Sequence, residues 1–179
     1  MARATKAMPD TKMMSGELFT LTYGALVLDL CKDLESAEDV NRQLDKIGYN
    51  MGLRIADDFL AKNPRIGRCA EMQQVADIIS KNALKSYLGV TAQATSVSPN
   101  GDEYSIVLES NPLVEFVEIP PEWSKICYSQ VICGAIRGAL EALHMEVLVQ
   151  LASDVPNPTE IRIKFRRVLH EMMPAGDED

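Results

Sequence analysis

The clearest periodic pattern in the chain lies in SAEDVNRQLDKIGYNMGLRIADDFLAKNP, residues 36–64. Apolar residues recur there every three or four positions, which is the spacing of one face of an α-helix; they are Val40, Leu44, Ile47, Met51, Ile55 and Phe59. Ser36 followed by Asp39 is similar to a capping box at a helix start. Asn63-Pro64 ends the pattern, because a residue before proline avoids the helical conformation. We therefore predict a helix between these two signals.

Gly48 and Gly52 lie one turn apart inside this predicted helix. Each glycine costs about 1 kcal/mol relative to alanine in a helix interior, so a compensating contact is expected. Close approach of another backbone would supply it, whereas the alternative is a local bend. Gly134 and Gly138 repeat the spacing in a later helical stretch.

The rest of the chain adds three helices and four strands to this one. Apolar residues at helical spacing (Leu18, Leu21, Ala25 and Leu28) predict a first helix. The predicted helices are 16–34, 70–88 and a long one from Pro120-Pro121 to about Leu143, in which Arg137 is spaced to pair with Glu141. The predicted strands are 91–97, 103–109, 145–152 and 159–168, with a turn at 98–102. This order predicts the α+β class.

Composition and charge narrow the range of functions. A length of 179 residues with 46% hydrophobic and 25% charged residues indicates one globular domain. The net charge of −8 argues against nucleic-acid binding. Pro9, Asp10 and Lys12 interrupt any signal peptide, and residues 123–145 are too polar to span a membrane. We expect a cytoplasmic protein with a disordered arm at 1–14, a single domain at 15–170 and an acidic tail at 171–179.

Cys69 is the cysteine whose surroundings favour chemistry. It follows Arg68, lies near Arg65 and falls in or just before the first turn of the third predicted helix. Positive charge at a helix N-terminus stabilises the thiolate. The other cysteines (Cys31, Cys127 and Cys133) lie in apolar runs and are expected to be inert. No pair has CxxC spacing and His144 and His170 are remote in sequence, so we predict no metal site.

Three roles for Cys69 stay open at this point. A catalytic thiol needs a histidine base, and neither histidine belongs to a recognisable motif. A single acylation needs no base, but a sixteen-carbon chain in water costs roughly 12 kcal/mol at about 0.8 kcal/mol per methylene. Such a chain must lie in a membrane or inside the protein, where Ala76, Ile79 and Ala83 are candidates for lining a channel. An unmodified loop thiol is the third role.

Seven segments in register carry a resemblance to a known family. They are ELFTLTYGALVLDLCKD (17–33), GYNMGLRIADDFLAK (48–62), GRC (67–69), SYLGV (86–90), NPLVEFVEIP (111–120), CGAIRGALEALHM (133–145) and MPAGDED (173–179). Together they resemble the Bet-three-like subunits of the transport protein particle, TRAPP. The resemblance covers nearly everything after residue 14.

The resemblance implies a four-stranded antiparallel sheet with a layer of about four helices on one side, dimerising through helices as a homodimer or with related TRAPP subunits. It implies a non-catalytic core subunit of a complex that tethers vesicles from the endoplasmic reticulum at the cis-Golgi. It also implies that the assembled complex is a nucleotide exchange factor for a Rab-type GTPase. The expected location is cytoplasmic and peripheral at those membranes.

The resemblance also assigns a covalent palmitate, or similar acyl group, to Cys69, with its chain in an internal channel. Arg68 and Ala83 match family residues beside the thiol and the channel. Departures occur at 70–72, which lack the family's histidine and aromatic residue, and at Asn82, which would burden the channel if it faced inward. A reversible lipid-binding protein and, further off, a thiol acyltransferase are the alternatives.

Two charged segments are further candidates. In the family the C-terminal segment reaches the GTPase near its nucleotide, and Asp177, Glu178 and Asp179 match it in charge; a solvated tail is the alternative. In the last predicted strand Arg162, Lys164 and Arg166 alternate with apolar residues, which gives one basic face. That face suits anionic headgroups, or else solvent or an acidic sister subunit.

Overall fold

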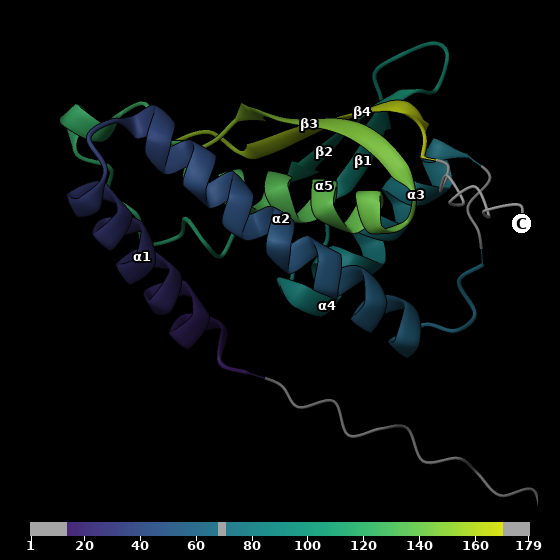
Figure 1. The fold of residues 1–179 in the computed structure, drawn as a ribbon, viewed down its shortest axis with the longest axis horizontal. Helices are drawn as coiled ribbons and strands as arrows, with labels where there is room; N and C mark the ends of the chain where they lie inside the picture. Colours follow the sequence, from purple (N-terminus) through teal and green to yellow (C-terminus); the bar gives the residue numbers. More distant parts are fainter. Residues whose placement is uncertain (1–13, 68–70, 170–179) are drawn as a thin grey trace, which may run out of the picture.

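The four strands form one antiparallel sheet in the order β1-β2-β4-β3, as the computed structural model shows for the described residues 14–67 and 71–169 (Figure 1). The helical elements are α1 (Gly16–Asp33), α2 (Ala37–Lys62), α3 (Met72–Ile78), the π-helical η1 (Ile79–Ala83), α4 (Leu84–Tyr87), the 3₁₀ turn η2 (Pro121–Trp123) and α5 (Gln130–Ala142). The strands are β1 (Gln93–Ser96), β2 (Glu103–Leu108), β3 (Met145–Ser153) and β4 (Thr159–Val168). The predicted α+β class is confirmed.

One face of the sheet carries the core. Ile106 of β2 pairs with Ile161 of β4 in the ladder, and both side chains are fully buried. The neighbouring Arg162 points to the opposite face and is exposed. α5 packs against β3, and α3 packs against β2. The helices therefore cover one side of the sheet, with α2 lying on α5 (Figure 1).

The α2–α5 contact explains the paired glycines. A side chain at any of four positions would run into the backbone of the opposite helix: Gly48 meets Val131, Gly52 meets Ala135, Gly134 meets Asp45 and Gly138 meets Tyr49. The close approach of two backbones is thus the reason for the glycines, and the contact lies within one chain.

Polar side chains flank this glycine contact. Arg137, predicted to pair with Glu141 in its own helix, instead pairs with Asp45 of α2. Its guanidinium carbon lies 4.6 Å from the centre of the Tyr49 ring. The Tyr49 hydroxyl donates a hydrogen bond of 2.9 Å to Glu141. These contacts fix the two helices side by side.

The long helix predicted from Pro120 to Leu143 is wrong in its first half. Only a 3₁₀ turn forms at Pro121–Trp123, and α5 begins at Gln130. Between them, side chains from elsewhere satisfy the backbone: the Cys127 N–H donates to Asn41, the Ser129 N–H donates to Asp154, and the Tyr128 carbonyl accepts from Tyr23. These tertiary hydrogen bonds replace the bonds that a helix would have made.

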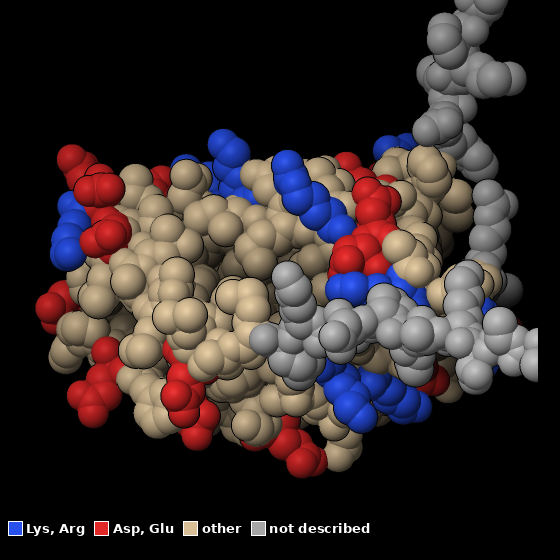
Figure 2. All heavy atoms as spheres, turned by 90° about the horizontal axis from the view of Figure 1, so that it is seen from below, with Lys and Arg blue, Asp and Glu red and all other residues tan. Residues whose placement is uncertain are grey.

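α1 turns its predicted apolar row away from the body of the protein. The residues that anchor it are Tyr23 and Val27, both buried. Leu18, Leu21 and Leu28 are 58%, 72% and 63% exposed. Seen from below, the left half of the molecule shows a broad area without Lys, Arg, Asp or Glu, and charged side chains lie around it (Figure 2). No helix in the described ranges is both long and apolar enough to cross a bilayer.

Candidate functional site

An apolar cavity of about 890 Å³ lies among the helices. Its walls come from α2, the helical segment 72–87, α5 and the loops at their ends. Cavities that bind small apolar ligands have volumes of about 300–1,000 Å³. The size and lining therefore suit a long hydrocarbon chain.

The α2 wall is the second half of the row that predicted this helix. Val40 and Leu44 are completely buried in the core. Further along, Met51, Ile55 and Phe59 line the cavity. The helical periodicity of the sequence placed all of these residues in one apolar row. It did not indicate that the first half of the row packs in the core and the second half lines the cavity.

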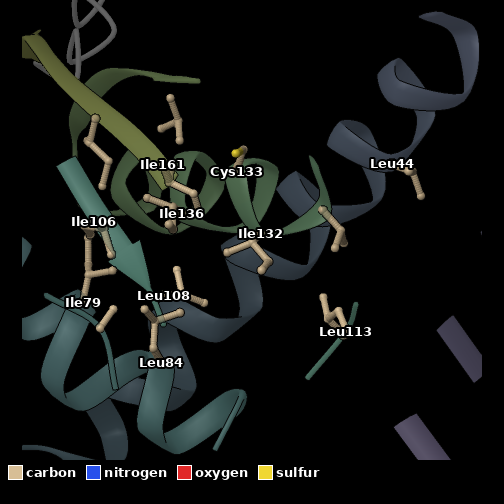
Figure 3. Packing of buried hydrophobic residues seen from close by; sticks show 14 of the residues in the cluster. Leu44, Ile79, Leu84, Ile106, Leu108, Leu113, Ile132, Cys133, Ile136 and Ile161 are labelled. Atoms are coloured by element: carbon tan, nitrogen blue, oxygen red, sulfur yellow. The ribbon is translucent and has the colours of Figure 1, made fainter. Parts of the chain in front are cut away.

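The opposite wall is the segment α3–η1–α4. Val75, Ile79, Ala83 and Tyr87 stand four residues apart and all line the cavity. In a regular α-helix, residues four apart advance by about 40° around the axis. The wider π turn at 79–83 reduces this advance, so the row stays on the cavity side. Ile79 and Leu84 also point toward Ile106 and Leu108 of the sheet (Figure 3).

Of the three predicted lining residues, Ile79 and Ala83 line the cavity. Ala76 is buried, with 2% of its surface exposed, but it is not among the described lining residues. It stands about 100° around the helix from Val75, which places it beside the row. Asn82 is exposed, so its amide does not place an unpaired polar group in the apolar cavity.

α5 gives the cavity its length. The lining residues run from Val131 near the start of this helix to Leu143 at its end, which is roughly 18 Å at 1.5 Å per residue. Gly48 and Gly52 of α2 meet successively later residues of α5, so the two helices run in the same direction. The end of α2 and the following loop consequently lie at the Leu143 end.

The residues that precede the predicted attachment site in the sequence line the Leu143 end of the cavity. Ile66 and Gly67 line the cavity together with His144 and Val168. Arg68 and Cys69 follow Gly67 directly in the sequence but lie outside the described residues, as do Asp177, Glu178 and Asp179. Arg65 is exposed. α3 begins at Met72, with Glu71 at its N-cap.

The three described thiols are poor nucleophiles. Burial raises the pKa of Cys31 and that of Cys127. Burial, with Asp45 and Asp154 adding to it, raises the pKa of Cys133 far above its usual range. A raised pKa leaves less thiolate at neutral pH. Their expected inertness therefore has a physical cause.

A polar cluster ties the end of α2 to α4 beside the cavity. The Tyr87 hydroxyl donates to Asp58 Oδ2 at 2.5 Å, and Lys62 Nζ lies 2.6 Å from the same oxygen. The hydrogen bonds from Lys62 and Tyr87 lower the pKa of Asp58. Burial and the Asp58 hydrogen bond raise the pKa of Tyr87. Asp58 and Lys62 stand four residues apart in α2, but Tyr87 comes from a separate helix, so no spacing in the sequence indicates that it joins them.

The basic strand face has acidic neighbours. Arg162 pairs with Glu160 at 3.2 Å, and Lys164 pairs with Glu103 at 3.4 Å. Arg166 is exposed where the β3–β4 register shifts. The face is consequently less positive than its strand pattern predicts. Across the described ranges, no group of histidine, cysteine and carboxylate side chains could hold a metal.

Comparison with known proteins shows which family and which relatives this chain is similar to. The sequence profile described as "Transport protein particle (TRAPP) component" matches residues 19–166. The chain is 52% identical to the trafficking protein particle complex subunit 3 homolog of Caenorhabditis briggsae, over the full length of both chains. It is 43% identical to the transport protein particle subunit bet3 of Schizosaccharomyces pombe, over 92% of this chain and 91% of that one.

A solved structure shows the same fold. It is the crystal structure of a trafficking protein particle complex subunit 3 from Naegleria fowleri, covalently bound to palmitic acid. The match has a TM-score of 0.82 and 40% identity, and covers 87% of this chain and 98% of that one. With the profile spanning most of the sequence and these identities over nearly whole chains, the chain belongs to the TRAPP component family.

Proposed function

We propose that this chain is a non-catalytic scaffold subunit of a TRAPP-type complex and carries a palmitoyl-type chain on Cys69, buried in the apolar cavity. The observation that carries the proposal is the cavity itself, which is lined at one end by Ile66 and Gly67, just before Cys69 in the sequence. The palmitate-bound relative supports the same assignment.

The proposed attachment is a single thioester exchange. The Cys69 thiolate attacks the carbonyl carbon of an acyl thioester such as palmitoyl-CoA, a new carbon–sulfur bond forms, and the coenzyme A thiolate leaves. Arg68 and Arg65 stabilise the attacking thiolate. The chain then enters the cavity, where about 0.8 kcal/mol per methylene favours its retention.

The test is intact-mass measurement of purified protein. We expect a hydroxylamine-labile adduct of palmitoyl mass on wild type and on Cys127→Ser, which replaces a half-buried thiol, and no adduct on Cys69→Ser. Loss of the buried chain should also lower the melting temperature of Cys69→Ser by about 5 °C, or roughly 2 kcal/mol for a domain of this size. The same acyl adduct on wild type and on Cys69→Ser, or no adduct on either, would contradict the proposal.

The same measurement separates the alternatives. A reversible lipid-binding protein would release its lipid on denaturation without hydroxylamine. A thiol acyltransferase would pass label from acyl-CoA to a second acceptor through many turnovers. We expect neither result, because a chain that packs along roughly 18 Å of α5 is held away from other acceptors.

At the level of the assembly, we propose that the complex tethers vesicles from the endoplasmic reticulum at the cis-Golgi and exchanges nucleotide on a Rab-type GTPase. Asp177, Glu178 and Asp179 would contact the GTPase, where carboxylates compete for Mg²⁺ and favour nucleotide release. An unchanged exchange rate in a complex lacking these three residues would remove the tail from the proposal.

We also propose that the subunit forms a homodimer through α1. Leu18, Leu21 and Leu28 expose an apolar row on this helix, and exposed apolar faces of this kind mark association sites. Between Leu18 and Leu28 the sequence has no charged residue. Two copies with a net charge of −8 each repel one another least at such a face.

A further inference from the structure

Tyr87, the last residue of α4, lies between the cavity and solvent. Its half-buried side chain lines the cavity, while its hydroxyl donates a hydrogen bond of 2.5 Å to Asp58 Oδ2 of α2. The Asp58 side chain is 47% exposed. One side chain thus reaches from the cavity to the surface, so the wall between α2 and α4 is one aromatic ring thick at this point.

Contacts with the last two turns of α2 hold the Tyr87 ring in place. Lys62 Nζ lies 5.6 Å from the centre of this ring and 2.6 Å from Asp58 Oδ2. The centre of the Phe59 ring, which also lines the cavity, lies 6.5 Å from that of Tyr87. Within the described residues, no other hydrogen bond or ion pair joins α4 to α2. The hydroxyl of Tyr87 is therefore the polar link across the gap between these helices.

The same side of α2 borders solvent further along. Met51 stands seven residues before Asp58, which places the two side chains on one side of the helix. Met51 lines the cavity and is 37% exposed. A hydrocarbon chain that approaches the gap beside Tyr87 consequently meets apolar atoms at its edge before it enters the cavity.

The backbone of α4 is held independently of the Tyr87 hydroxyl. Leu84, at the start of α4, is buried and points toward Leu108 of the sheet (Figure 3). Rotation of the Tyr87 side chain about its own bonds needs no movement of this anchor. The ring can thus leave the gap while the helix that carries it stays in place.

We propose that the Tyr87 ring is a gate for fatty acyl chains, held closed by its hydrogen bond to Asp58. This inference rests on the proposed function, because it concerns how an acyl chain enters the cavity, and it adds a route beside the end lined by Ile66 and Gly67. When the hydroxyl leaves Asp58, the ring swings outward and a gap opens between α2 and α4. A chain enters sideways through this gap, and the ring closes behind it.

The gate affects rates and not affinity. A hydrogen bond to a charged acceptor is stronger than one between neutral groups, and it must break before the ring moves. The bond lies on the outer side of the wall, so it forms whether or not a chain fills the cavity. Its loss therefore lowers the barriers to entry and to exit equally. A merely structural role for Tyr87 would not change both rates by one factor at constant affinity.

The experiment measures the entry and exit of cis-parinaric acid, a fatty acid that fluoresces in apolar surroundings, by stopped-flow fluorescence. All proteins carry Cys69→Ser, so that no covalent chain occupies the cavity. We expect Tyr87→Phe to raise both rates about 10-fold, which corresponds to about 1.4 kcal/mol, and to leave the dissociation constant unchanged. Asp58→Asn weakens the same bond from the α2 side, should raise both rates by a smaller factor, and replaces Tyr87→Phe if that variant folds poorly.

Tyr49→Phe is the matched control. It also removes a tyrosine hydroxyl that donates to a carboxylate of another helix, Glu141 at 2.9 Å. Tyr49 is not among the described lining residues, so we expect unchanged rates. Tyr87→Ala removes the ring as well as the hydroxyl and should raise both rates beyond those of Tyr87→Phe.

The other outcomes decide against the gate. Unchanged rates in Tyr87→Phe and Asp58→Asn would overturn it and leave the proposed function in place. An equal rise in Tyr49→Phe would overturn it too, because general loosening of the helices would then explain the rates. So would a fatty acid that does not bind at all. A missing acyl adduct on Cys69 would contradict only the proposed function, since the gate is tested with a free fatty acid on Cys69→Ser protein.

Discussion

Asp58 is a surface carboxylate whose contacts link two helices beside the cavity. Hydrogen bonds from Lys62 and Tyr87 favour its charged form and lower its pKa. A carboxyl whose folded pKa lies below its unfolded value, about 3.9 for aspartate, adds stability above that value. This stability is lost as pH falls through the folded pKa. The link between α2 and α4 is therefore sensitive to acid.

Asp58→Asn should accordingly be less stable than wild type at neutral pH. The difference should narrow below about pH 4 and vanish once wild-type Asp58 is protonated. Urea unfolding at a series of pH values measures it. Asp57→Asn, at the preceding exposed position of α2, controls for the removal of one negative charge. A difference that stays constant from neutral to acidic pH would show that the carboxylate charge does not stabilise this contact.

At the scale of elements, the contact between α2 and α5 depends on missing side chains. A Cβ on Gly52 would meet the carbonyl oxygen of Ala135 and the amide of Ala139, which belong to the backbone and cannot move aside cheaply. Inserting atoms into packed interiors typically costs 1–3 kcal/mol. With backbone as the obstacle, the cost lies at the upper end of that range.

Gly52→Ala should therefore lower the free energy of unfolding by about 3 kcal/mol, even though alanine favours helix over glycine by about 1 kcal/mol. Chemical denaturation measures the change. Gly16→Ala is the matched control, since a Cβ there would meet no atom within 4 Å apart from its chain neighbours and the backbone of its own helix, and it should leave stability unchanged or slightly raised. A stable Gly52→Ala protein would mean that the two helices separate at little cost.

The elements also show how far sequence reasoning reaches. Periodicity located α1, α2 and the strand pairs, because alternation and helical spacing are local properties. It did not show that Leu18 and Leu21 of α1 face outward. An apolar row on the outside of a helix has the same residue spacing as an apolar row that faces the core. Periodicity missed the break before Gln130, because the groups that satisfy this backbone (Asn41, Asp154 and Tyr23) come from distant segments.

The candidate site was predictable only in part, for the same reason. The setting of Cys69 is local and visible in sequence. Ile79 and Ala83 were anticipated as lining residues, while the contributions of Met51 and Phe59 needed the packing of α2 over the other helices. A π turn has no sequence signature in this chain, so the register that places Asn82 outside could not be read in advance.

At the scale of the whole molecule, charge opposes contact with anionic membranes. The net charge is −8, and Arg162 and Lys164 pair with carboxylates on the same sheet face. Exposed pairs of this kind are individually weak, so Arg162 and Lys164 remain able to exchange partners. Membrane contact through Arg162, Lys164 and Arg166 is therefore proposed as a weak, salt-dependent interaction.

Flotation with phosphatidylserine vesicles tests this contact. We expect binding at low ionic strength that disappears near 0.15 M salt, where the Debye length falls to about 8 Å. Arg162→Ala/Lys164→Ala/Arg166→Ala should abolish it, whereas Arg42→Ala, which removes an exposed charge from α2, should not. Flotation that persists in the triple variant would assign the contact to another surface.

The glycine contact between α2 and α5 has a consequence for lipid selection. Because the two backbones are in contact, the cavity walls formed by α2 and α5 cannot move apart to fit a different hydrocarbon chain. Any accommodation of a longer, bent or unsaturated hydrocarbon falls to the short helical segment opposite, where the π turn already departs from regular geometry. Sequence changes at 75–88 should therefore alter which fatty acids the cavity accepts, whereas replacement of the glycines should destabilise the fold.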